Sequence, residues 1–349
     1  MIPFISFAQE NQPLRLGVVG LSHGHLGEVI RRVNRGDFVI TGISEGDDSL
    51  REKNGLRGKV ADDLFYADLE EMLDKTKPEA VIVYEPIAYH LRVVEACAPR
   101  GIHVMVEKPL ATKKADAQRM AELARKHKIH LLTNYETTWY ASLHETYRMI
   151  NQSKIGGITR INVYDGHRGP FEIGCGKEFT DWLTDPVLNG GGAVIDFGCY
   201  GANLATWFLN GKKPVSVYAV LNQQKPQLYP KVDDDATIIV QYPNQTVQIM
   251  ASWNWPINRK DMHIYGEKGY IYQDNATDLR VYVKNKETAQ KSPSLKTPYD
   301  DPFHYFKAVV RNEIKVEPAD LSSLENNLIV VSILDAAVRS GKSGSVVKL

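Results

Sequence analysis

A single charged residue, Asp196, stands within the otherwise uncharged stretch between residues 190 and 203. The apolar spacing predicts a buried helix there, and a helix places residues four and seven apart on one face. Asp196, Tyr200 and Asn203 would therefore form one polar stripe. Because an ionised carboxylate is costly to bury without a partner, we expect this stripe to line a cleft. The alternative is a structural role, with Asp196 hydrogen-bonded inside a capped helix.

Lys108 is the second candidate for chemistry, since it follows an apolar run and Glu107 and precedes Pro109. If that run is a strand, the Lys108 ammonium would lie at the mouth of the strand, where a nucleotide and a substrate would meet. Pro109 would fix the turn, with a cis peptide bond as one option. Lysine is usually exposed, so an ordinary surface lysine is the competing interpretation.

Gly20 ends the first apolar run and marks the expected diphosphate-binding turn. The dinucleotide fingerprint is incomplete, because Ser22 and His25 occupy its second and third glycine positions and Gly24 comes one place early. Glu45 ends the second run, where an acid can bind both ribose hydroxyls of NAD. We expect no nearby arginine to receive a 2′-phosphate, so NAD is favoured over NADP. A solvated loop acid is the alternative for Glu45.

These residue types suit hydride transfer to or from an alcohol carbon. A hydroxyl that loses hydride from its carbon must also lose a proton, so a general base has to lie within hydrogen-bond reach. Free tyrosine is a poor base at neutral pH, but a neighbouring ammonium such as Lys108 would favour the phenolate and lower the pKa of Tyr200. Asp196 would orient the pair or relay the proton.

The first half of the chain alternates short apolar runs with amphipathic segments, which would bring these residues together. Predicted strands cover residues 14–19, 38–43, 80–84, 102–106 and 130–133, and predicted helices cover 24–33, 68–75, 89–100 and 113–128. This alternation predicts a doubly wound parallel sheet of the Rossmann type, in which ligands bind beyond the carboxyl ends of the strands.

The pattern changes near residue 135. A helix over 143–151, alternating strands at 158–164, 215–221, 237–242 and 247–253, and a final helix over 324–339 predict an open, mainly antiparallel sheet. We therefore expect an α/β protein with an N-terminal extension (1–13), an NAD-binding Rossmann domain (14–134) and a second domain (135–349), whose role in substrate binding and oligomerisation is implied by the resemblance described below.

Composition limits the possible partners. Lys plus Arg equals Asp plus Glu at 42 each, which gives no field for nucleic acid, and no apolar run reaches the ~18 residues of a membrane span. The three cysteines have no CxxC spacing and indicate no compartment. Residues 6–8 resemble a signal-peptidase site. We therefore leave two locations open, cytoplasmic and exported.

Several motifs, in order along the chain, resemble the Gfo/Idh/MocA oxidoreductases, the relatives of glucose-fructose oxidoreductase and inositol dehydrogenase. They are Pro86 with His90, residues 107–111 (EKPLA), Trp182 followed by residues 190–192 (GGG) and 196–200 (DFGCY), residues 234–237 (DDAT) and 265–269 (YGEKG). The resemblance runs nearly end to end. It implies a Rossmann domain followed by a domain whose open sheet forms a dimer or tetramer interface and contributes substrate contacts.

The resemblance also implies roles for individual residues. Lys108 would hydrogen-bond the reacting oxygen beside the nicotinamide, and Asp196 and Tyr200 match the two polar positions of the family, with Tyr200 where many members carry a catalytic histidine. Asn203 stands where many members have an acid, and the altered glycine turn is the other departure from the family pattern.

Further candidates surround these residues. The expected cofactor contacts also include Glu85, Pro86, His90 and Glu107, and the expected turn residues beside the diphosphate are His23 and His25. Substrate contacts are expected from His167, Arg168, Trp182 and Asn203, although Trp182 could equally be a packing residue. No His, Cys and acid cluster has metal-ligand spacing in the sequence, so we predict no metal.

Together these observations predict an NAD-dependent dehydrogenase or reductase for a sugar, a sugar derivative or a cyclic polyol. One alternative keeps the cofactor, as in NAD-dependent glycosidases that oxidise a sugar hydroxyl transiently. Another is a non-catalytic nucleotide-binding or sugar-binding protein, because fold does not fix function.

Overall fold

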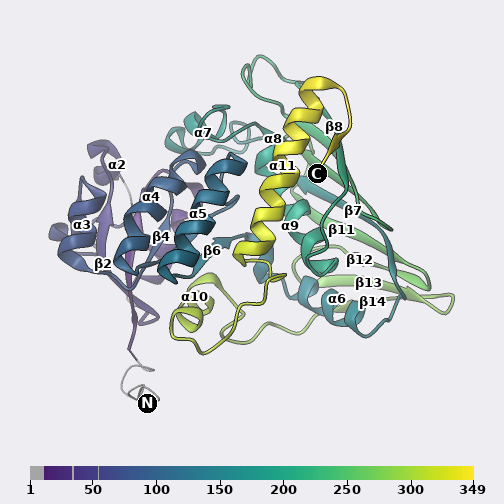
Figure 1. Ribbon diagram of the computed structural model, residues 1–349, viewed down its shortest axis with the longest axis horizontal. Helices are drawn as coiled ribbons and strands as arrows, with labels where there is room; N and C mark the ends of the chain where they lie inside the picture. The colour runs from purple at the N-terminus through teal and green to yellow at the C-terminus, as the bar shows by residue number, and fades with distance from the viewer. Residues whose placement is uncertain (1–11, 34, 54) are drawn as a thin grey trace.

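The computed structural model describes residues 12–33, 35–53 and 55–349, which form two sheets with helices packed around them (Figure 1). Most of the expected N-terminal extension, including the residues that resemble a signal-peptidase site, lies outside these ranges. No helix in the described part of the chain has the length and apolarity that a membrane span requires.

The first sheet has six parallel strands in the order β3-β2-β1-β4-β5-β6. They are β1 (Leu14–Val19), β2 (Phe38–Ser44), β3 (Phe65–Tyr66), β4 (Ala80–Val83), β5 (His103–Glu107) and β6 (Leu131–Asn134). β1 pairs with β2 on one side and with β4 on the other, so the strand order reverses at β1. In such sheets a ligand crevice opens at the carboxyl ends of the strands where the order reverses.

Helices cover both faces of this sheet, and β4 shows why. Its side chains alternate between the two faces of the sheet. Val81 and Val83 belong to the hydrophobic core on one face, and Ala80 and Ile82 belong to the core on the other. The helices of this half are α1 (Gly27–Arg32), α2 (Asp48–Lys53), α3 (Leu69–Thr76), α4 (His90–Cys97) and α5 (Lys114–His127), with the short 3₁₀ segments η1 (Gly24–Leu26), η2 (Asp62–Leu64), η3 (Ile87–Tyr89), η4 (Ala98–Arg100) and η5 (Glu136–Trp139).

The second sheet has nine strands in the order β14-β13-β12-β11-β7-β10-β9-β8-β15. They are β7 (Ile158–Gly166), β8 (Ser216–Asn222), β9 (Asp235–Gln241), β10 (Thr246–Ser252), β11 (Arg259–Gly266), β12 (Gly269–Gln273), β13 (Asp278–Val283), β14 (Lys286–Lys291) and β15 (Val347–Lys348). β7 and β10 pair in parallel, and the other neighbours pair antiparallel.

Helices cover one face of the second sheet (Figure 1). The helices of this half are α6 (Ala141–Asn151), α7 (Lys177–Leu183), α8 (Ala193–Asp196), α9 (Gly198–Phe208), α10 (Pro302–Val310) and α11 (Leu324–Ser343). Inward side chains such as Val163 and Ile249 share one core with residues of α9 and α11. Side chains that alternate with these, including Tyr164, Tyr270 and Tyr282, are only partly buried, which leaves a face rich in aromatic rings.

Two C-terminal helices return to the first half of the chain. Phe303 and Phe306 of α10 pack in the same core as Leu16 and Val18 of β1, although the sequence assigns α10 to the second domain. Val331 of α11 joins the core on the other face of the first sheet. The two halves therefore share packed elements, which holds the cleft between them in a defined shape.

The predicted fold class, a doubly wound parallel sheet followed by a large, mainly antiparallel sheet, is confirmed. The predicted strands differ from the observed ones by at most two residues at either end. The Lys108–Pro109 peptide bond is cis. The pattern did not predict α2, α7 or α10, because the segments that form them lack a long amphipathic repeat.

Candidate active site

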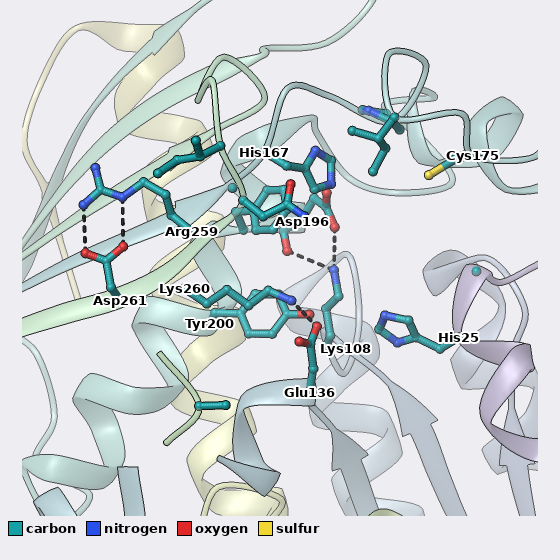
Figure 2. A pocket seen from close by; sticks show the side chains of 18 of the residues that line it. His25, Lys108, Glu136, His167, Cys175, Asp196, Tyr200, Arg259, Lys260 and Asp261 are labelled. Carbon is teal, nitrogen blue, oxygen red and sulfur yellow. Dashed lines mark hydrogen bonds and ion pairs between the residues drawn. The ribbon is translucent and has the colours of Figure 1, made fainter. Parts of the chain in front are cut away.

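A cavity of about 550 Å³ lies between the carboxyl ends of the first sheet and the second domain. Figure 2 shows that its polar side chains come from both halves of the chain. The lining includes His23, Gly24 and His25 of the first turn, Lys108 after β5, and Asp196 and Tyr200 from α8 and α9. The structure therefore brings together the three residues that the sequence nominates for chemistry.

Lys108 and Asp196 form a buried ion pair at the centre of this cavity. The Lys108 Nζ donates to Asp196 Oδ1 at 2.5 Å and to the Asp196 carbonyl at 2.9 Å, and both side chains are 7% exposed. The indole of Trp253, which follows β10, donates to Asp196 Oδ2 at 2.9 Å. Asp196 thus has a partner on each oxygen, as a buried carboxylate requires.

The pair sets the protonation of both groups. Burial alone would raise the pKa of Asp196, but the Lys108 ammonium outweighs burial and lowers that pKa to about 2. Burial alone would lower the pKa of Lys108, but the Asp196 carboxylate raises it instead. At neutral pH the pair is therefore an ammonium and a carboxylate.

The glycines before Asp196 are needed for its placement. A Cβ on Gly192 would lie 1.7 Å from the carbonyl oxygen of Asp233, so only glycine allows this approach. The Asp233 carboxylate accepts from the backbone N–H of Gly192 at 2.8 Å and of Val194 at 2.7 Å. Asp233 thereby caps α8, the short helix that ends at Asp196.

Tyr200 lines the cavity from α9, with its ring against two amines. The ring centroid is 5.0 Å from Lys108 Nζ and 4.8 Å from Lys260 Nζ. The expectation of a lowered pKa is wrong for this structure, because burial and the nearby Glu136 carboxylate raise the pKa of Tyr200 well above its usual value. Tyr200 is therefore a neutral phenol.

Asn203 does not line the cavity, unlike the expectation from the sequence. Its amide donates to the Leu321 carbonyl at 2.7 Å and to Asn326 Oδ1 at 3.1 Å, and it is fully buried. The helix is interrupted at Phe197, between α8 and α9. Asp196 therefore does not lie on one continuous helix with Tyr200 and Asn203. Asn203 faces α11 instead.

The three other expected substrate contacts lie in different places. His167, at the end of β7, lines the cavity, and burial lowers its pKa. Arg168 is exposed, and its carbonyl accepts from Lys225. Trp182 is buried and packs against His23, with ring centroids 5.6 Å apart, and against Phe179. Arg168 and Trp182 are thus not among the residues that line the cavity.

The Gly20 turn requires glycine, although the dinucleotide fingerprint around it is incomplete. Gly20 has a φ of 79°, and a Cβ there would lie 2.9 Å from the backbone nitrogen of Glu85. Ser22 follows and is buried, with its hydroxyl 3.4 Å from the Tyr84 carbonyl. Glu45 accepts from the backbone N–H of Leu21 at 2.9 Å, so it supports the turn and stands at the end of β2.

His23 and His25 of this turn come together with Glu107 of β5, with possible ligand atoms within 4.8 Å of one another. The sequence spacing did not reveal this cluster. His23 Nδ1 accepts the backbone N–H of His25 at 3.1 Å, which leaves the proton of a neutral His23 on Nε2. That nitrogen then donates rather than ligates, so the cluster does not suit a metal ion as it stands.

The Glu107 carboxylate is instead held by two side chains. It accepts from Asn134 at 2.8 Å and pairs with His25 Nδ1 at 3.0 Å. Burial alone would raise the pKa of Glu107, but His25 outweighs it and lowers that pKa to about 2. Burial alone would lower the pKa of His25, but Glu107 raises it.

The other expected cofactor residues follow β4. Glu85 pairs with Arg92, and burial raises the pKa of Glu85 to about 7. Pro86 precedes η3. His90 Nδ1 contacts the Leu110 carbonyl at 3.1 Å, and burial lowers the pKa of His90 to about 4. His90 therefore supports the loop that carries Lys108 and does not line the cavity.

Sequence reasoning missed a second group of cavity residues: Glu136, Tyr140, Arg259, Lys260 and Asp261. Glu136 stands two residues after β6, so inspection of every strand end would have found it. Arg259, Lys260 and Asp261 are the first three residues of β11, and charged residues are common on a half-exposed strand of this kind.

Comparison with known proteins identifies the class to which this fold and site belong. The family model described as "Oxidoreductase family, NAD-binding Rossmann fold" matches residues 14–135, and the model described as "GFO/IDH/MocA C-terminal domain" matches residues 143–272. The chain belongs to the Gfo/Idh/MocA family and is an oxidoreductase with an NAD-binding Rossmann domain.

Individual relatives are more distant. The chain is 25% identical to a trans-1,2-dihydrobenzene-1,2-diol dehydrogenase of Xenopus tropicalis over 78% of this chain and 82% of the relative. It is 24% identical to a myo-inositol 2-dehydrogenase of Thermotoga maritima over 91% of this chain and 93% of the relative. The fold matches an inositol dehydrogenase homologue of Azotobacter vinelandii, solved with NAD⁺, with a TM-score of 0.84, 17% identity and coverage of 97% and 98%.

Proposed function

We propose that this chain is an NAD-dependent dehydrogenase or reductase that acts on a sugar, a sugar derivative or a cyclic polyol. One observation carries the proposal: the buried Lys108–Asp196 pair lies against the Tyr200 ring, at the carboxyl end of β5 and inside the cavity. An ammonium and a phenol at one point can hold and protonate a substrate oxygen.

The described residues fit NAD. Gly20 forms a tight turn directly after β1, which is where a dinucleotide diphosphate binds in such sheets, and Glu45 stands at the end of β2, where a carboxylate accepts from the ribose hydroxyls. The same carboxylate would repel a 2′-phosphate, which is the reason to favour NAD over NADP. When bound, NAD supplies the hydride acceptor or donor.

The protein residues supply position and protons. The Lys108 ammonium would hydrogen-bond the substrate oxygen and stabilise negative charge that develops on it. Tyr200, as a neutral phenol, is a proton donor, so the free protein is set up to protonate a carbonyl oxygen. In the reverse direction Tyr200 would have to start as the phenolate, so that it accepts the proton of the hydroxyl and becomes a neutral phenol again, while Lys108 stays an ammonium. Asp196 keeps Lys108 charged and in place.

The substrate class is supported by the lining and by the relatives. The cavity carries hydroxyl-binding groups on several sides, including His167, Glu136 and Lys260. The named relatives act on a diol of a six-membered ring and on inositol.

For the open aromatic face of the second sheet, we infer contact with further copies of this chain, as a dimer or tetramer. Light scattering of the purified protein tests this inference.

Mass spectrometry of the nucleotide released from the purified protein tests the cofactor, with NAD(H) as the expected species. A panel of sugars and polyols with that nucleotide, followed through the absorbance of NADH, then tests the reaction. Lys108→Met should reduce kcat by at least about 10²-fold, because it removes the group that stabilises charge on oxygen. Undiminished turnover would remove Lys108 from the chemistry.

Two other outcomes would replace the proposal. Release of an aglycone without net NADH would indicate a glycosidase that oxidises its sugar transiently. Calorimetry that detects no affinity for NAD or NADP would indicate a binding protein that retains only the fold.

A further inference from the structure

Tyr200 lies against a second ammonium–carboxylate pair besides Lys108 and Asp196. Lys260 of β11 contacts a carboxylate oxygen of Glu136, and its Nζ is 4.8 Å from the centroid of the Tyr200 ring. The Tyr140 hydroxyl donates to the other oxygen of Glu136 at 2.5 Å. Figure 2 shows Lys260 and Glu136 meeting beside the Tyr200 ring, with Lys108 nearby.

The two pairs have the same chemistry. An ammonium only donates hydrogen bonds and a carboxylate only accepts them, whereas a hydroxyl does both. A hydroxyl can therefore bind to each pair without leaving a donor or acceptor unmatched. We propose that the Lys260–Glu136 pair binds a second hydroxyl of the substrate, close to the one that reacts, and that the site selects uncharged polyols. This inference rests on the proposed function of Lys108 and Tyr200.

The charges of the cavity support an uncharged substrate. Within the described part of the chain, the cations of the lining each have a carboxylate partner: His25 with Glu107, Lys108 with Asp196, Arg259 with Asp261, and Lys260 with Glu136. Burial lowers the pKa of the remaining histidines, His23 and His167, which keeps both neutral. A substrate carboxylate or phosphate would have to displace one of these partners.

A purely structural role is the competing explanation for the pair. Glu136 follows the first sheet and Lys260 belongs to the second, so the contact also joins the two halves. If the pair had only a structural role, loss of the pair would lower the stability of the protein and would weaken the binding of every ligand equally. A binding role would change the ability of the protein to distinguish a hydroxyl from a hydrogen, which only binding and kinetic measurements with matched ligands can detect.

The test uses the full chain loaded with NAD or NADH and compares myo-inositol, D-glucose and methyl β-D-glucoside with their monodeoxy derivatives and with D-glucuronate. Calorimetry gives affinity, and NADH absorbance gives kcat/KM. For the wild type we expect loss of one particular hydroxyl, other than the reacting one, to weaken binding and kcat/KM by about 10- to 100-fold. D-glucuronate should bind at least about 10-fold more weakly than D-glucose.

Lys260→Met should lower the affinity for the parent polyol by a similar factor and abolish the discrimination against the deoxy compound. Lys260→Arg, which keeps the positive charge, should retain part of this discrimination. Lys177→Met, which removes a lysine from the exposed pair with Asp181, is the control and should change neither value. Thermal unfolding of all variants separates a loss of folding from a loss of binding.

Each outcome has a separate meaning. Equal binding of all deoxy compounds, a preference for D-glucuronate, or unchanged discrimination in Lys260→Met overturns this inference and leaves the proposed function standing. Discrimination in binding without any turnover overturns the proposed function and supports the second hydroxyl site. If calorimetry detects no binding of any of these polyols, both are overturned.

Discussion

The Lys108–Asp196 pair makes a quantitative prediction for Asp196→Asn. The substitution keeps the side-chain shape but leaves the Lys108 ammonium, which is 7% exposed, without a counter-charge. Removing one partner of a buried pair costs about 3–5 kcal/mol. We expect the free energy of unfolding at pH 7 to fall by about 3 kcal/mol, since the asparagine oxygen can still accept one hydrogen bond.

The same pair predicts how this loss depends on pH. The pKa of Asp196 is about 2 in the folded protein and 3.8 when unperturbed, so its stabilising contribution is complete above pH 3.8 and is lost as the pH falls towards 2. That difference corresponds to about 2 kcal/mol. The gap between the wild type and Asp196→Asn should therefore shrink by about 2 kcal/mol between pH 7 and pH 2.

At alkaline pH the gap should also shrink. Without Asp196, burial should lower the pKa of Lys108 below its unfolded value, so the unfolded variant binds more protons and its stability rises with pH up to that value. Urea unfolding followed by circular dichroism measures both limbs. Asp181→Asn, at the exposed pair with Lys177, is the control and should cost less than about 1 kcal/mol. If Asp196→Asn costs no more than this control at pH 7, the buried pair is not the electrostatic centre of the site.

Three further substitutions test separate parts of the structure. Tyr200→Phe should lower kcat by about 10²-fold or more with little change in nucleotide affinity, because it removes the proton donor and not a nucleotide contact; steady-state kinetics decides this, and an unchanged kcat would exclude the phenol. Gly20→Ala should weaken nucleotide binding at least about 10-fold in calorimetry, because its Cβ would meet Glu85 and φ is positive, and wild-type affinity would show that the turn does not carry the nucleotide. Asn203→Ala should lower the free energy of unfolding by about 1–3 kcal/mol while KM stays unchanged, since Asn203 contacts Leu321 and Asn326 and not the cavity; a raised KM in a stable variant would contradict this placement.

The fold was predictable because its signals are local. Five of the six strands of the first sheet are short apolar runs, all but the two-residue β3, and most of the helices have one apolar face, so alternation along the chain identifies the parallel sheet. α10 shows the limit of this reasoning. Its apolar residues Phe303 and Phe306 complete the core around β1, nearly 300 residues earlier in the chain, and no local pattern says which sheet a late helix will cover.

The site was predictable where a residue violates the expectation for its surroundings. Asp196 is such a case, since a lone acid in an apolar stretch needs a partner, and the structure supplies Lys108 and Trp253. The prediction for Asn203 was wrong because this residue lies one turn further along α9 than Tyr200, where Leu321 and Asn326 cover it, and no local pattern shows which side of α9 a late segment will cover. Lys260 was missed for the opposite reason, because a lysine on a half-exposed strand agrees with the expectation for its surroundings.

The position of the site at the junction of the two sheets explains why both kinds of residue are needed. Lys108 leaves β5 of the first sheet, whereas Asp196 and Trp253 belong to the second half of the chain. The Lys108–Asp196 pair, which keeps the lysine charged, therefore also joins the two halves. Lys260 and Glu136 form another such contact beside Tyr200. A substrate held between the pairs would touch both halves at once, so its binding should depend on their relative position. The α10 and α11 helices, which pack against the first sheet from the C-terminal part of the chain, maintain that position.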